Sequence, residues 1–142
     1  MNTSKNNFEI QSEWLPCQTP PEKLISFLLD INHLESILPK DKIKNIQSTQ
    51  PDSISFEIEN IIQLTLHIDT TQPSFNNTYH TVRYTSEPFG NYHLELIAQF
   101  DHLYSQIILT GHLNTFVLSI AKNKLKHLVQ KINKELSSLS LP

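Results

Sequence analysis

Alternating apolar and polar positions between residues 53 and 68 predict two β-strands joined as a hairpin. The stretch reads SISFEIENIIQLTLHI, and its apolar residues keep one parity on each side of Asn60. Folding it about Asn60 gives the pairs Ile54 with Leu66, Phe56 with Leu64, and Ile58 with Ile62. Asn tolerates the left-handed backbone that a short turn requires. All six apolar side chains then lie on one face of the hairpin, which therefore needs a covering layer.

The same period-two pattern predicts five further strands, over residues 8–18, 43–49, 79–86, 92–100 and 104–113. The strands over 79–86 and 92–100 are expected to pair, with Val82 opposite Leu96 and Tyr84 opposite Leu94. That register places Arg83, the single arginine of the chain, opposite Glu95 on the outer face. An ion pair across the two strands is the simplest role for Arg83; a register shifted by one residue would instead turn it inward, to bind a carboxylate or phosphate.

Three helices are expected. The sequence TPPE at residues 19–22 predicts a helix start with a Thr cap, and Asn32 is expected to cap a second short helix that ends at Pro39. A helix over 115–139 carries an apolar stripe at helical spacing, formed by Phe116, Val117, Ile120, Ala121, Leu125, Leu128, Val129, Ile132, Leu136 and Leu139. Its opposite side is rich in lysine, which is most simply a solvated face, although a partner surface is an alternative. At roughly 37 Å this helix matches the roughly 33 Å of a ten-residue strand.

These elements predict one α+β domain over residues 8–142, preceded by a disordered tail over residues 1–7. In this domain a curved, seven-stranded antiparallel sheet wraps around the long C-terminal helix, and two short helices follow the first strand. The C-terminal helix is expected to lie across the whole concave face of the sheet.

Composition narrows the classes of partner and compartment. With 18% charged residues and a net charge of −3, the chain gives no reason to expect nucleic acid or an anionic membrane as a partner. Cys17 is the single cysteine, which excludes an intramolecular disulfide and favours a reducing compartment. No apolar run resembles a secretion signal or reaches the length of a bilayer span, so a cytoplasmic protein without stable membrane insertion is expected.

The order strand, two short helices, six strands, long helix resembles the START / Bet v 1-like (SRPBCC) superfamily, and in particular its bacterial polyketide cyclase/dehydrase-like members. The resemblance covers about residues 8–139 and is carried by the segments TPPEKLISFLLDINHLESILP and LNTFVLSIAKNKLKHLVQKI. Thr115 stands where bacterial members often have proline at the strand-to-helix junction. The glycine-rich loop of plant members has no counterpart over residues 47–53. The resemblance implies a helix-grip fold, in which the sheet and the long helix usually enclose a cavity.

A small hydrophobic or lipid-like molecule is the ligand that such a cavity implies. Its expected lining combines inward strand positions with the helix stripe: Ile54, Phe56, Leu64, Leu66, His80, Val82, Tyr84, Leu94, Leu96, Leu125 and Val129. The loops over 69–77 and 87–91 are expected to flank its opening. Large side chains can also fill such a space, so a packed core without a cavity is the alternative.

Catalytic chemistry has few candidates. Tyr84 and His80 are the polar residues expected inside, and together they form the acid–base pair that a cyclase or aromatase would need. No pair of carboxylates is expected on the inner face. Cys17 is expected to be an inert, buried thiol. The seven histidines lack metal-ligand spacing, so neither a metal nor a cofactor is predicted.

Three functions therefore remain open from the sequence. The first is a non-enzymatic binding protein for a small hydrophobic molecule. The second is an enzyme of cyclase or aromatase type that acts on a polyketide-like substrate, and the third is an adaptor with a filled core. The sequence leaves the ligand and the oligomeric state unknown.

Overall fold

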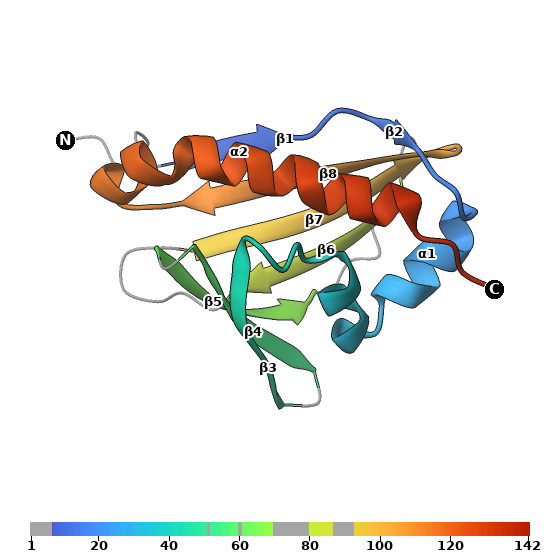
Figure 1. Ribbon diagram of the computed structural model, residues 1–142, viewed down its shortest axis with the longest axis horizontal. Coiled ribbons are helices and arrows are strands. Elements are labelled where there is room, and N and C mark those ends of the chain that lie inside the picture. The colour runs from blue at the N-terminus through green and yellow to red at the C-terminus, as the bar shows by residue number, and fades with distance from the viewer. Residues whose placement is uncertain (1–6, 51, 60, 70–79, 87–92) are drawn as a thin grey trace.

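One antiparallel sheet and three helices make up the computed structural model, which describes residues 7–50, 52–59, 61–69, 80–86 and 93–142 (Figure 1). The helices are α1 (Pro21–Leu28), the 3-10 helix η2 (Ile31–Ile37) and α2 (Thr115–Ser138). The strands are β1 (Asn7–Gln11), β2 (Leu15–Pro16), β3 (Ile43–Gln50), β4 (Ser53–Ile58), β5 (Ile62–Ile68), β6 (His80–Ser86), β7 (His93–Asp101) and β8 (Tyr104–His112). Residues 1–6 of the expected tail lie outside the described ranges, while Asn7 belongs to β1.

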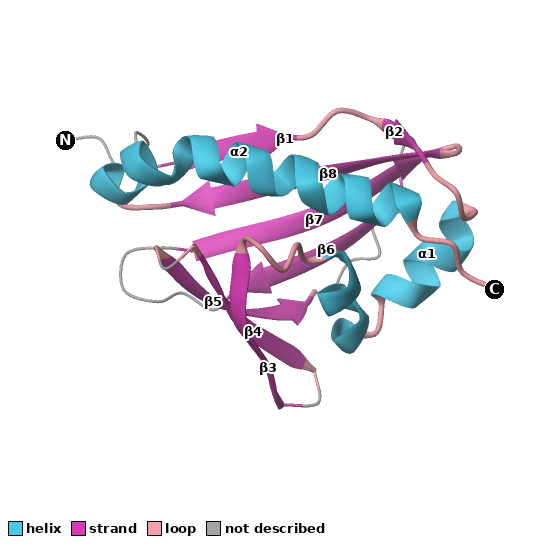
Figure 2. Cartoon of the chain, in the orientation of Figure 1, coloured by secondary structure: helices cyan, strands magenta, loops and turns pink. Residues whose placement is uncertain are grey.

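The sheet follows the order β1-β8-β7-β6-β5-β4-β3, and the short β2 also pairs with β8 (Figure 2). The predicted seven-stranded antiparallel sheet is therefore confirmed, with its first strand divided in two. The division occurs at Ser12, whose hydroxyl accepts a hydrogen bond from Ile107 N at 2.9 Å and donates one to Glu13 O at 3.0 Å. Between the end of β1 and the start of β2, these bonds take the place of regular backbone pairing with β8.

The two short helices have different caps from those predicted. Pro20 precedes α1 without any side-chain cap, because the hydroxyl of Thr19 donates to Leu139 O at 2.7 Å and accepts from Leu141 N at 3.0 Å. Helix η2 is capped by Asp30, whose carboxylate accepts from the backbone N–H of Asn32. Asn32 is thus the capped residue and not the cap. Thr19 instead attaches the C-terminal tail to the start of α1.

The predicted register of the β4–β5 hairpin is confirmed. Ile54 pairs with Leu66, Phe56 with Leu64 and Ile58 with Ile62, and all six side chains are buried. Asn60, the expected turn residue, lies outside the described ranges. Its neighbour Glu59 has a φ of +46°.

The register between β6 and β7 differs from the prediction by two residues. Val82 pairs with Ala98 and Tyr84 with Leu96, so Glu95 is opposite Thr85. A shift of two preserves which side chains face the core, because strand parity has period two. Arg83 still reaches the diagonal Glu95, with Nη1 and Oε1 2.8 Å apart. The expected ion pair therefore forms, although the two residues are not directly opposite each other in the register.

Helix α2 begins at a cap that the sequence patterns did not predict. The side chain of Asn114 accepts from Phe116 N at 2.7 Å and from Val117 N at 3.4 Å. The apolar stripe is buried from Ala121 to Leu136, but Phe116 and Ile120 at its start are 72% and 49% exposed. The stripe therefore covers the sheet only from its second turn onward.

Helix α2 lies along β8 and β1 on one side of the sheet, while α1 and η2 contact β6 and β4 (Figure 1). The expectation that one helix crosses the whole concave face is therefore replaced by a layer of three helices. A buried amide fixes α2 in this place. Asn133, 0% exposed, donates to Glu13 O at 2.7 Å and to Ser105 O at 3.1 Å, and it accepts from Ser105 Oγ at 2.7 Å.

Candidate functional site: a small apolar cavity and an open basic groove

A small apolar cavity lies between α2 and the inner face of the sheet. Eleven side chains line it: Leu38, Phe56, Ile58, Leu64, Leu66, Leu94, Leu96, Leu109, Leu128, Val129 and Ile132. They come from the end of η2, from strands β4, β5, β7 and β8, and from neighbouring turns of α2. The cavity volume is about 10 Å³, roughly what one water molecule needs. The core around it is thus nearly filled.

Six of the predicted lining residues do line this cavity, namely Phe56, Leu64, Leu66, Leu94, Leu96 and Val129. Ile54, Val82, Tyr84 and Leu125 are buried in the same core but lie outside the lining. His80 was placed wrongly: its side chain is exposed at the first residue of β6. Inward parity alone does not bury a side chain, since Val82 and Tyr84 of the same strand are buried while His80 at its first residue is exposed.

Five lining residues were not predicted from the sequence: Leu38, Ile58, Leu109, Leu128 and Ile132. Two signals were available. Ile58 has the same parity as Ile54 and Phe56, and both Leu128 and Ile132 belong to the apolar stripe of α2. Leu38 was expected on the second short helix but not in the lining, and in the structure it follows the end of η2. Leu109 gave no such signal, because it lies on a strand with apolar residues on both faces.

Tyr84 and His80 do not form an acid–base pair. The hydroxyl of Tyr84 donates to Leu28 O at 2.7 Å, and the side chain is 1% exposed. Burial raises the pKa of Tyr84, so the phenol keeps its proton. Four residues of strand, about 13 Å, separate it from the exposed His80. Tyr84 therefore connects β6 to the end of α1, and the cyclase hypothesis loses its proposed catalytic groups.

Other chemically reactive groups are sparse in the part of the chain that the structure describes. Burial raises the pKa of the Cys17 thiol, against a smaller lowering by its hydrogen bond with Ser105, so the thiol is a weak nucleophile. Within the described ranges, no group of three or more His, Cys, Asp or Glu side chains is arranged to hold a metal ion. No described helix is long and apolar enough to span a membrane.

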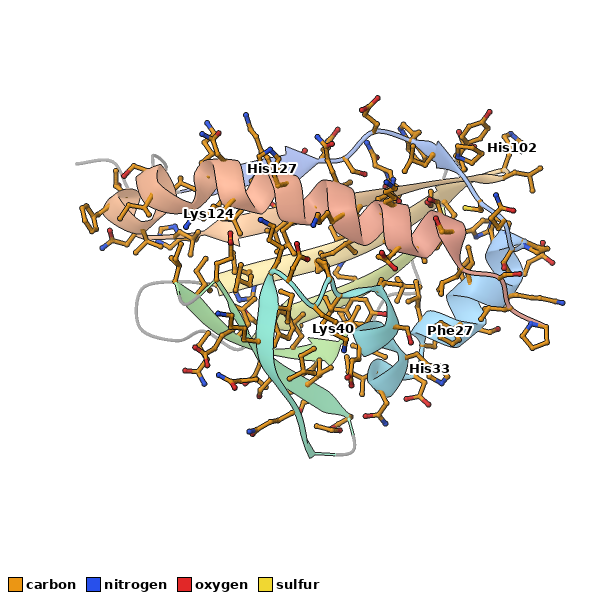
Figure 3. The ribbon with its side chains drawn as sticks, in the orientation of Figure 1. Phe27, His33, Lys40, His102, Lys124 and His127 are labelled. Atoms are coloured by element: carbon orange, nitrogen blue, oxygen red, sulfur yellow. The ribbon has the colours of Figure 1, made fainter. Side chains whose placement is uncertain are left out.

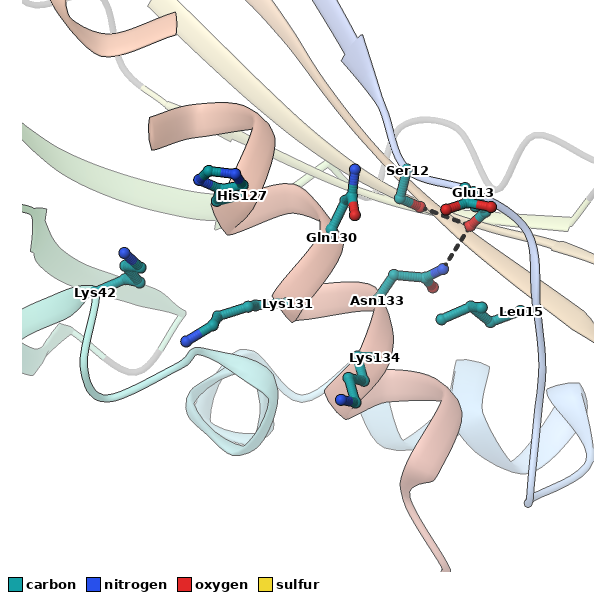
Figure 4. Close-up of a pocket in the computed structure, with 9 residues that line it drawn as sticks. All are labelled: Ser12, Glu13, Leu15, Lys42, His127, Gln130, Lys131, Asn133 and Lys134. Atoms are coloured by element: carbon teal, nitrogen blue, oxygen red, sulfur yellow. Dashed lines mark hydrogen bonds between the residues drawn. The ribbon is translucent and has the colours of Figure 1, made fainter. Parts of the chain in front are cut away.

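A second hollow, an open groove of about 380 Å³, runs beside the outer surface of α2 (Figure 4). Its lining includes three lysines and one glutamate: Ser12, Glu13, Leu15, Lys42, His127, Gln130, Lys131, Asn133 and Lys134. Several of these polar side chains already bind other residues of the protein. Lys131 binds Asp41 at 2.6 Å, Lys42 is 3.7 Å from Glu59, and the amide of Asn133 makes the bonds described above.

The exposed carboxylate of Asp41 has its pKa lowered, mainly by the hydrogen bond from Lys131. The groove therefore contains a pre-existing ion pair at one end. Three of its lining residues are lysines, so a guest in the groove would meet charged groups, whereas the internal cavity is lined by apolar side chains alone. Of the two hollows, the internal cavity is the one whose surface suits a hydrophobic ligand.

The element order, the sheet order and the long terminal helix packed on the inner face define the helix-grip fold, as predicted. No protein-family model matches the chain, and its sequence matches no curated protein.

Solved structures with a similar chain path include TTHA0849 from Thermus thermophilus, with 12% identity, a TM-score of 0.49, and coverage of 92% of this chain and 94% of that one. DR_A0006 from Deinococcus radiodurans is 8% identical, with a TM-score of 0.47 over 84% of this chain and 95% of its own. Ara h 8.0201 is 13% identical, with a TM-score of 0.45 over 92% and 97%. The assignment of the fold rests on the elements and their order, and these values carry no statement about function.

Proposed function

We propose that the protein binds a small hydrophobic molecule between the sheet and α2, at the cavity lined by Phe56, Leu64, Leu96 and Val129. The observation that carries this proposal is the wholly apolar lining of the cavity, contributed mainly by four strands and α2. A void bordered by apolar side chains can enlarge without breaking a hydrogen bond, and a guest would restore the packing contacts that are lost. A guest would gain roughly 25 cal/mol for each Å² of apolar surface it buries, before ordering costs.

The cavity must enlarge for this function, because about 10 Å³ does not hold an organic molecule. The start of α2 is the part of the covering layer that supports such a movement. Phe116 and Ile120 contribute little to the core there, and Val117 and Leu118 are only half-buried. The expected opening near residues 69–77 and 87–91 falls almost wholly outside the described ranges.

Native mass spectrometry of freshly purified protein, followed by titration with a fluorescent fatty-acid analogue, tests the proposal. The wild-type protein is expected to carry a guest or to take up the analogue. Leu128→Phe fills the cavity from α2 and is expected to reduce uptake at least about tenfold. Overpacking a core costs roughly 1–3 kcal/mol, and a guest in the filled cavity would raise that cost further. Leu103→Phe, at an exposed position on the β7–β8 turn, is the matched control.

Two results would overturn the proposal. One is a wild-type protein that carries no guest and takes up no analogue. The other is equal uptake by the Leu128→Phe and Leu103→Phe variants, which would place the bound molecule elsewhere. Circular dichroism of both variants verifies that each has kept its fold.

A further inference from the structure

The charge of the protein is distributed unevenly, and α2 carries the positive part. Five lysines lie on this helix, Lys122, Lys124, Lys126, Lys131 and Lys134, against one acid, Glu135. Helix α2 therefore has a formal charge of +4, which leaves −7 for the rest of a chain whose net charge is −3. The net charge of the whole chain gave no reason to expect an anionic partner, but the surface of α2 is basic.

Most of these lysines are free to meet a partner. Lys131 is held by Asp41 at 2.6 Å. Lys122, Lys124, Lys126 and Lys134 are exposed, and none of the four makes an ion pair or a side-chain hydrogen bond with another described residue. Lys124 and His127 mark the middle of this surface in Figure 3. From residue 116 to residue 134 the helix extends about 27 Å.

Two large apolar side chains project from the same helix beside these lysines. Phe116 is 72% exposed and Ile120 is 49% exposed. With Lys124 they follow each other at intervals of four residues, so all three lie on one side of α2. Lys134 falls on this side as well, while Lys122 and Lys126 project from one flank of it. The exposed surface formed by Phe116, Ile120 and the four free lysines is here called the α2 crest.

We propose that the α2 crest docks on the surface of an anionic lipid bilayer. The lysines would lie among the headgroups, where each contributes to electrostatic attraction, while Phe116 and Ile120 enter the acyl boundary. The crest is convex and its lysines are irregularly spaced. A fluid layer of mobile negative charges adapts to such spacing, whereas an acidic protein would need a matching pattern of carboxylates. Nucleic acid would match the lysines but would leave the apolar pair unused.

Flotation with lipid vesicles tests this docking on the full chain. Vesicles of phosphatidylcholine alone are compared with vesicles of phosphatidylcholine and phosphatidylglycerol in equal amounts. Binding is expected only to the anionic vesicles, and it is expected to weaken as salt is added. The double variant Lys124→Gln, Lys126→Gln is expected to lose affinity about 25-fold, at roughly fivefold for each lysine. Phe116→Ser with Ile120→Ser is expected to lose about tenfold or more.

Matched controls separate the crest from a general effect of charge or hydrophobicity. Lys44→Gln removes an exposed lysine from β3, and Leu103→Ser removes an exposed apolar residue from the β7–β8 turn. Both are expected to bind vesicles as the wild type does. Docking on the α2 crest is overturned if the wild type ignores anionic vesicles, binds neutral vesicles equally well, or loses as much affinity through the control variants as through the crest variants.

This docking does not depend on the proposed ligand. Lys124 and Lys126 lie outside the cavity lining and beyond the first turns of α2 that are proposed to move, so uptake of the fatty-acid analogue from solution is expected to stay unchanged in the Lys124→Gln, Lys126→Gln variant. Leu128→Phe is expected to show the opposite pattern: it should lose uptake of the fatty-acid analogue and still bind anionic vesicles. The two proposals can therefore fail separately.

Discussion

Gly111 lies on β8 opposite Leu94 of β7, where the backbones leave no room for a side chain. Its φ is +153°, and a Cβ atom placed there would lie 2.2 Å from the backbone oxygen of His93 and 2.9 Å from Cα of Leu94. Both obstacles are backbone atoms, so no side chain can rotate away to make room. The chain has only two glycines, and this one is required by the close approach of two strands.

We expect Gly111→Ala to lower the free energy of unfolding by about 2–4 kcal/mol, through steric overlap and backbone strain. Chemical denaturation followed by circular dichroism measures the change. Hydrogen exchange of the backbone amides in the β7–β8 ladder, where Leu94 is opposite Gly111, is expected to be faster in the variant. Unchanged stability would mean that β7 and β8 separate more easily than the structure implies.

At the scale of elements, parity was predictable and register was not. The alternation of apolar residues placed Val82 and Tyr84 in the core correctly, because parity depends only on local sequence. The pairing with β7 was wrong by two residues, since a shift of two leaves every buried side chain buried. Arg83 and Glu95 did not resolve the ambiguity, because a diagonal ion pair forms as well as a direct one.

The helix caps were mispredicted for a related reason. A Thr before two prolines is a good cap by local rules, but Thr19 is occupied by the backbone of residues 139 and 141. Tertiary bonds of this kind leave no mark on local sequence. The buried Asn133 was likewise unforeseen, because a single polar residue among the lysines of α2 resembles any other solvent-facing position.

The position of α2 on the sheet depends on Asn133. Replacing it with Ala leaves Ser105 and the carbonyl of Glu13 without their buried partner, and we expect unfolding to become easier by about 2–4 kcal/mol. Asn123→Ala changes an exposed amide earlier on the same helix and is expected to stay within about 0.5 kcal/mol of the wild type. Thermal and urea unfolding of the pair measure the difference. Equal stability would show that apolar packing alone positions α2.

At the scale of the whole molecule, the sequence predicted the fold and left its interior undecided. Element order and apolar faces sufficed for the helix-grip topology, because those features follow from periodicity. The cavity was not predictable, since its volume is the small difference between the space enclosed by the sheet and helices and the volume of the side chains that fill it. His80 shows a further limit: a residue of inward parity at the end of a strand can still be exposed, and the local pattern does not reveal this.

The N-terminal segment and the C-terminal tail are joined in this architecture. Thr19 binds the backbone of Leu139 and Leu141, and Gln18 N donates to Ser137 O at 2.9 Å. We expect Thr19→Val to lower stability by about 1–2 kcal/mol and to speed hydrogen exchange at the Leu141 amide. Thr85→Val, on the outer face of β6, is the control and should change neither. Normal protection of Leu141 in Thr19→Val would show that the tail is held by other contacts.

The pairing of β1 with β8 sets a condition on biosynthesis. Asn7 aligns with His112 and Gln11 with Ile108, so β1 leaves the ribosome long before the strand that pairs with it. Contacts between such distant segments close slowly, and the apolar side chains of β1 and of the β4–β5 hairpin stay uncovered meanwhile. We therefore expect the nascent chain to benefit from chaperones, so that production at low temperature or with a co-expressed holdase raises the soluble yield.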